Sequence, residues 1–171
     1  MRTYESIRVS DIYKVIPTLD TSAYANGDFL TQFEIENVYT KGDGVTTVLE
    51  LIDITDFASQ NIGFDFFFFD SEPTVASSVN DALDITDSEM EKKIGSLSLA
   101  ASGGLNIYTS TASNSSLTTA CINLPLRRRE KDDIDIGSEV VNSRSLFVVM
   151  KARGAATYLA DSLSIRFGFR S

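Results

Sequence analysis

Apolar residues recur at every second position in most of the windows where they cluster, and this alternation restricts the fold more than any other feature. Successive side chains of an extended strand point to opposite faces, so a period of two is typical of β-strands, whereas an amphipathic helix repeats about every 3.6 residues. β-Branched and aromatic residues, which favour strands, dominate the same windows. The sequence therefore predicts a protein built mainly from β-strands.

The alternation marks eight or nine strands, separated by turn residues such as Pro17 and the Asn26-Gly27-Asp28 triplet. In the strand expected at residues 29–36, the side chains of Phe29, Phe33 and Ile35 should share one face. The expected strands cover residues 7–15, 29–36, 45–54, 62–69, 94–99, 105–109, 117–124, 145–151 and 163–169.

Two of these windows raise specific expectations about faces. In residues 45–54, Leu49 and Leu51 should share one face, with Val48 and Ile52 on the other. In residues 62–69, aromatic residues occur on both faces near the end of the strand, so each face needs a cover.

One short helix is predicted before the fifth strand. Thr86 can accept a hydrogen bond from the first turn, and Glu89, three residues later, completes a capping box. Gly95 stands where a C-terminal cap is expected, which limits the helix to two turns.

Many strands with almost no helix favour a two-sheet sandwich over any α/β arrangement. We predict an all-β, jelly-roll-like sandwich that forms a single domain over residues 1–171, with an immunoglobulin-like Greek-key sandwich as the alternative.

Charge and residue content narrow the function. A formal net charge of −9 repels phosphate and disfavours binding to nucleic acid or to an anionic membrane. The sequence contains no apolar run of membrane-spanning length and does not open on a secretory signal, so we expect the chain to fold in a cytoplasm. Cys121, between Ala120 and Ile122, is expected to be a small core residue.

The residues give no support for catalysis or for a cofactor. Histidine is absent, which removes the commonest general base near neutral pH and a common metal ligand. The tetrapeptide Asp-Ile-Thr-Asp occurs at 53–56 and again at 84–87, but it lacks the spacing of a calcium loop and is expected to serve strand ends and a helix cap. We expect no enzyme, no metal and no cofactor.

Two groups of residues are candidates for a partner interface. Phe67 and Phe69 lie on the second face of their strand, where either the helix after Thr86 or a loop covers them, or a partner subunit does. Arg127, Arg128 and Arg129 open a charged segment that is expected to be a solvated loop or to pair with acidic groups of a partner.

Three stretches resemble small jelly-roll proteins encoded among the head genes of tailed phages, the capsid decoration or cement proteins. These stretches are residues 19–28, residues 66–70, and residues 154–158 leading into 163–169. The resemblance implies a virion protein without an active site, which binds the major capsid protein on the outer capsid surface as a dimer or trimer. The charged segment after Arg127 departs from the plainer members of that family.

Two other function classes remain open. A sugar- or receptor-binding module of a head fibre or tail needs exposed aromatic platforms, and in the absence of tryptophan these are Tyr39, Tyr108 and Tyr158. A small carbohydrate-active enzyme needs two carboxylates facing each other across a cleft.

Overall fold

The computed structural model describes residues 11–39, 46–100, 107–112, 115–128 and 145–170. The regular structure within these residues is almost entirely β, with nine strands of five or more residues, two strands of two residues and one helical turn. The predicted all-β fold with one short helix is confirmed. The elements are β1 (Asp11–Val15), β2 (Ala23–Tyr24), β3 (Phe29–Ile35), β4 (Thr46–Asp56), β5 (Gly63–Phe69), α1 (Asp87–Met90), β6 (Lys93–Leu99), β7 (Ile107–Ala112), β8 (Ser115–Arg127), β9 (Leu146–Arg153), β10 (Ala156–Thr157) and β11 (Leu163–Arg170).

The strand pairing is that of one long antiparallel hairpin wrapped into two sheets. From the ends of the chain inward, β1 pairs with β11, β3 with β9, β4 with β8 and β5 with β6. Two further pairings join these four pairs into sheets: β11 pairs with β4 in one sheet, and β5 pairs with β9 in the other. The result is a five-stranded sheet, β1-β11-β4-β8-β7, and a four-stranded sheet, β3-β9-β5-β6. This is the jelly-roll order, not the immunoglobulin-like order.

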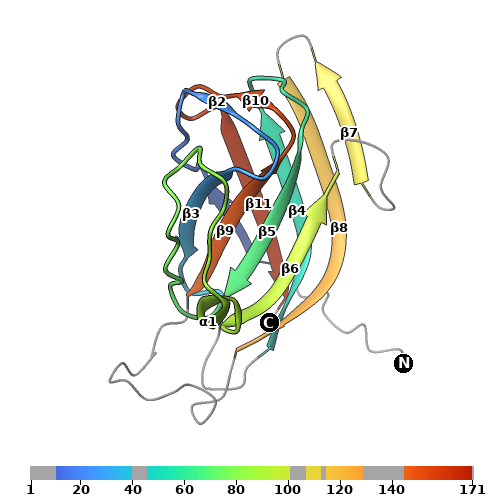
Figure 1. Ribbon diagram of the computed structural model, residues 1–171. Helices are drawn as coiled ribbons and strands as arrows, with labels where there is room; N and C mark the ends of the chain where they lie inside the picture. The colour runs from blue at the N-terminus through green and yellow to red at the C-terminus, as the bar shows by residue number, and fades with distance from the viewer. Residues whose placement is uncertain (1–10, 40–45, 101–106, 113–114, 129–144, 171) are drawn as a thin grey trace, which may run out of the picture.

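Figure 1 shows the two sheets as layers, with the four-stranded sheet in front of the five-stranded one. A small ribbon of β2 and β10 crosses one end of the sandwich, and α1 lies at the opposite end beside the four-stranded sheet. No helix within the described part of the chain is long and apolar enough to cross a membrane.

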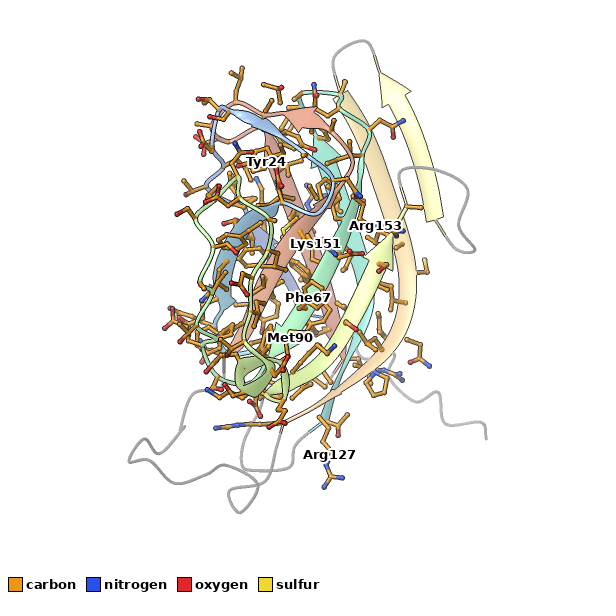
Figure 2. All side chains as sticks on the ribbon, viewed as in Figure 1. Tyr24, Phe67, Met90, Arg127, Lys151 and Arg153 are labelled. Atoms are coloured by element: carbon orange, nitrogen blue, oxygen red, sulfur yellow. The ribbon has the colours of Figure 1, made fainter. Side chains whose placement is uncertain are left out.

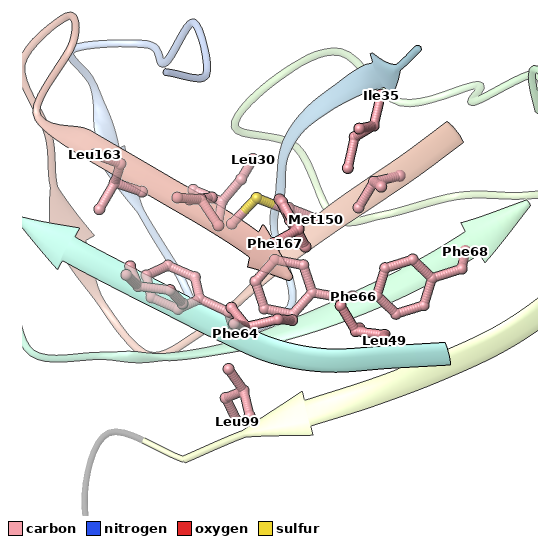
Figure 3. Packing of buried hydrophobic residues seen from close by; sticks show 14 of the residues in the cluster. Leu30, Ile35, Leu49, Phe64, Phe66, Phe68, Leu99, Met150, Leu163 and Phe167 are labelled. Carbon is pink, nitrogen blue, oxygen red and sulfur yellow. The ribbon is translucent and has the colours of Figure 1, made fainter. Parts of the chain in front are cut away.

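The core lies between the sheets and is filled by the predicted alternate side chains. Phe64, Phe66 and Phe68 of β5 point into it, and Phe167 of β11 meets Phe66 edge-on at 6.0 Å between ring centroids. Figure 3 shows these rings packed together with Leu49 and Met150 between the layers. A continuous apolar interior of this kind is the main source of stability in a two-sheet sandwich.

Two β-bulges change faces that simple alternation predicts. In β4 the register shifts between Leu49 and Leu51, so Leu49 is buried with Ile52 while Leu51 points outward. In β3 the register shifts beside Phe29, which joins a second apolar cluster on the outer face, whereas Ile35 lies in the main core. The predicted faces of Leu51 and Phe29 are therefore wrong, because a bulge adds one residue and reverses the alternation after it.

The helix has the predicted N-cap and ends earlier than predicted, and the Glu89 carboxylate, which was expected to complete a capping box, accepts a hydrogen bond from the Thr74 amide at 3.1 Å. Thr86 caps it by accepting a hydrogen bond from the Glu89 amide at 3.4 Å. Gly95 is not its C-terminal cap, since the helix ends at Met90 and Gly95 lies inside β6. A Cβ atom at Gly95 would lie 2.5 Å from Cδ2 of Leu126 in β8, so glycine lets the two sheets approach along this edge.

Candidate interaction surface

Phe69 is enclosed by the chain itself. It is fully buried in a small cluster with Phe29 and Val149 on the outer face of the four-stranded sheet. Side chains of the segment between β5 and β6 cover this cluster, among them Val75, Leu83, Ile85 and Met90. Of the two predicted arrangements, cover by the helix after Thr86 and its loop is therefore the one found, and Phe69 is removed from the candidate interface.

Local hydrogen bonds hold this cover in place. The Glu89 carboxylate of α1 accepts a hydrogen bond from the Thr74 amide at 3.1 Å and forms an ion pair with Lys92 at 2.6 Å. A β-bridge between Val75 and Ile85 closes the loop on itself. The cover ends at Met90, the last residue of α1.

Phe67 lies at the border of the covered region and is half-buried. The Nζ atom of Lys93 lies 5.7 Å from the centroid of its ring, and the Nζ atom of Lys151 lies 5.8 Å from it. Both distances fall within the range of about 6 Å in which an ammonium group is attracted to an aromatic face. Two cations are therefore held beside a partly exposed aromatic ring.

Asp65 precedes Phe67 on the same face of β5 and pairs with two cations of β9. Its carboxylate lies 2.9 Å from Nζ of Lys151 and 3.6 Å from Nε of Arg153, and it accepts a hydrogen bond from the Ser98 hydroxyl at 2.6 Å. Burial acts to raise the pKa of Asp65, but the hydrogen bonds from Ser98 and Lys151 and the charges of Lys151 and Arg153 outweigh it and hold this pKa below its ordinary value.

These groups form one surface, which we call the Phe67 patch and show in Figure 2, where Phe67, Lys151 and Arg153 follow one another along the β5–β9 pair. Its three cations and one carboxylate sum to 3 − 1 = +2 on a chain of net charge −9. Alternation along β5 places Asp65 beside Phe67, but the cations come from β6 and β9, whose register the sequence does not reveal. The residues of the patch are Asp65, Phe67, Lys93, Ser98, Lys151 and Arg153.

The arginine group does not join this patch. Arg127 is exposed at the end of β8 in the other sheet, and Figure 2 places it well apart from Phe67. Arg128 is only 4% exposed, which corrects the prediction that it lies in a solvated loop. It lies close enough to the buried Tyr39 phenol to act on it electrostatically, as does the buried carboxylate of Asp70. Arg129 lies outside the described residues.

Two of the three candidate sugar platforms are buried. Tyr39 is 1% exposed and Tyr158 is fully buried, so neither ring is open to a ligand. Tyr158 packs against Tyr24 with ring centroids 6.1 Å apart, where β10 and β2 close the end of the sandwich. The side chain of Tyr108 lies outside the described residues.

Tyr39 and Tyr158 should stay protonated as long as the protein is folded. Burial raises the pKa of both phenols above the ordinary value of 10.0, and the carboxylates of Asp70 and Asp56 respectively raise it further. This contribution to stability is fully present below pH 10 and is lost as the pH rises above it, because the unfolded phenols ionise first.

In a spectrophotometric titration, at least two of the six tyrosines should ionise only together with unfolding. Complete ionisation near pH 10 with native circular dichroism would contradict this, and in the Tyr39→Phe, Tyr158→Phe double variant the number of tyrosines that ionise only on unfolding should fall by two.

The two Asp-Ile-Thr-Asp copies serve the backbone, as predicted. Asp56, at the end of β4, is 4% exposed and accepts hydrogen bonds from the amides of Ala58, Gln60 and Asn61 at 2.9, 2.8 and 3.2 Å. In the second copy Thr86 caps α1. Within the described residues, no group of three or more aspartate, glutamate or cysteine side chains is placed to hold a metal ion.

The outer face of the five-stranded sheet offers a contrasting surface. Ile12, Gly168, Leu51 and Cys121 stand in one row across four strands, and Ile12 is 61% exposed. Cys121 is exposed, so its predicted place in the core is wrong: the adjacent Ala120 takes the inward position in β8. On either side of the row, Arg166 pairs with Asp53 at 3.7 Å and Arg170 with Glu50 at 2.7 Å.

No protein-family model matches the chain, and a search among curated proteins finds no significant match.

Proposed function

We propose that the chain is a non-enzymatic structural protein of a tailed-phage particle, a decoration protein that binds the outer surface of the capsid lattice and stabilises it. In this proposal the chain is made in the host cytoplasm, takes the major capsid protein as its partner and assembles on the lattice as a dimer or trimer. It binds neither nucleic acid nor a membrane.

The observation that supports this proposal is that the aromatic and acidic side chains described above mostly serve the protein's own structure. The alternate residues of both sheets fill a continuous apolar core, and the conspicuous acids of the sequence, such as Asp56, bind backbone amides. Two buried tyrosines likewise belong to the interior. A molecule built in this way acts through its outer surfaces, and weak contacts repeated over a symmetric lattice add up to strong attachment.

Cosedimentation tests the proposal. Purified protein is mixed with expanded capsids and with unexpanded procapsids of the phage that encodes it, and bound protein is counted per capsid. We expect saturable binding to expanded capsids, and a rise in the temperature at which these capsids open. Light scattering should show a dimer or trimer.

The alternative function is a sugar- or receptor-binding module of a head fibre or tail. Two of its three aromatic platforms are buried, which favours the decoration role over it. Binding to a glycan array by protein that does not bind capsids would refute our proposal and support the alternative.

A further inference from the structure

We infer that the Phe67 patch is the surface through which the chain docks, and that it receives an extended, acidic segment of the partner protein. This inference rests on the proposed function, because it supplies the chemistry by which the capsid lattice would be recognised.

The distribution of charge distinguishes this patch from the opposite face. On the five-stranded sheet, Arg166 and Arg170 each have a carboxylate of their own. In the Phe67 patch, Lys151 and Arg153 share Asp65, and Lys93 lies over an aromatic ring. Because one carboxylate balances three cations, the patch retains the capacity to attract carboxylates from a partner.

The cations are also held in position before binding. Lys151 is fixed between the Asp65 carboxylate and the Phe67 ring, and its side chain is 29% exposed. Lys93 is fixed over the same ring from β6. Ordering a free lysine side chain opposes association, so side chains that are already ordered bind a carboxylate at a lower entropic cost.

The spacing of the patch favours an extended segment. Lys151 and Arg153 are two residues apart on β9, and Asp65 and Phe67 are two apart on the neighbouring β5. Alternate residues of a strand repeat about every 6.6–6.8 Å, which is also the spacing of alternate side chains in an extended peptide. A segment lying along these strands would place acidic side chains at alternate positions beside Lys151 and Arg153, with an apolar side chain near Phe67.

A protein segment fits the patch better than a nucleic acid does. The whole chain carries a net charge of −9, so a polyphosphate would be repelled over most of the surface. A short acidic segment brings only a few charges and keeps them within the patch. The Phe67 ring then adds the desolvated aromatic contact that is common at the centre of protein interfaces.

Two charge-matched double variants test the inference. The patch variant is Lys93→Gln with Arg153→Gln, and the control on the opposite sheet is Lys14→Gln with Arg166→Gln. Each removes one lysine and one arginine and changes the net charge from −9 to −9 − 2 = −11. The arginines are comparable, since Arg153 lies 3.6 Å from Asp65 and Arg166 lies 3.7 Å from Asp53, and their side chains are 42% and 55% exposed. Thermal unfolding of both variants checks that they are folded.

The readout is the affinity for expanded capsids at low and at high salt. We expect the patch variant to bind at least about tenfold more weakly than the wild type, and the control to bind as the wild type does. Wild-type binding should weaken with salt, and the patch variant should be less sensitive to it.

The outcomes separate this inference from the proposed function. If wild-type protein binds capsids and the patch variant binds equally well, or only the control loses affinity, the docking surface lies elsewhere and the proposed function stands. If wild-type protein binds no capsids at any salt concentration, both are overturned. Retention of DNA or RNA through the patch would overturn the assignment of an acidic protein segment.

Discussion

Replacing Phe66 with alanine should lower the free energy of unfolding by about 3–5 kcal/mol, the largest effect that we expect from a single substitution. Phe66 is fully buried at the centre of the core. Its ring lies 6.0 Å from that of Phe167 in an edge-on contact, and 6.4 Å from that of Phe68. Removing it takes away apolar burial and leaves a cavity that two pleated sheets cannot easily close.

Phe67→Ala is the matched control, because it removes the same ring from the adjacent position. Phe67 is half-buried and faces outward, so this variant should lose roughly 1–2 kcal/mol. Urea denaturation of both variants, with a common slope, measures the difference. Equal losses would mean that the outer face of β5 contributes as much to stability as the core, contrary to the packing described above.

Alternation alone predicted the fold class and the division of the β5 phenylalanines between two faces. Phe64, Phe66 and Phe68 point into the core, and Phe67 and Phe69 lie on the second face as predicted. An unbroken period of two is reliable because each residue reverses the face of the one before. The same rule failed at Leu51 in β4, where a bulge reverses the alternation and no pattern of residues indicates the bulge.

The strand order and the Phe67 patch depend on contacts between distant parts of the chain. Asp65 and Lys151 are 86 positions apart in the sequence (151 − 65 = 86), and they meet because β5 pairs with β9. Many pairings are compatible with one pattern of alternation, so the sequence indicated a sandwich and left its order open. The residues that contact Phe67 could therefore not be predicted from the sequence, whereas the face on which its side chain lies could be.

The prediction for Arg128 failed for a different reason, because it rested only on the composition of the charged segment around it. A run of charged residues is usually solvated, and this rule placed Arg128 in an exposed loop. The structure buries its side chain near the Tyr39 phenol, on which Asp70 also acts. A buried guanidinium is tolerated where acidic and polar groups surround it, and these groups come from segments that lie far away in the sequence.

The two Asp-Ile-Thr-Asp copies offer a second prediction, since identical tetrapeptides should respond differently to the same change. Asp56→Asn should lower the free energy of unfolding by about 1.5–3 kcal/mol. Both carboxylate oxygens of Asp56 accept amide hydrogen bonds, Oδ1 from Ala58 and Oδ2 from Gln60 and Asn61. An asparagine has one oxygen, so its NH2 group must face at least one amide donor at a position that is only 4% exposed.

Asp87→Asn is the matched control, because it occupies the same position of the second copy and changes the net charge equally. Asp87 is exposed in the first turn of α1, where a carboxylate favours the helix by about 0.3–1 kcal/mol. Urea denaturation at neutral pH compares the two variants. A larger loss in Asp87→Asn would show that α1 and its cover over Phe69 limit stability. The expected larger loss in Asp56→Asn would mean that the turn between β4 and β5, which connects the two sheets, depends on one buried carboxylate.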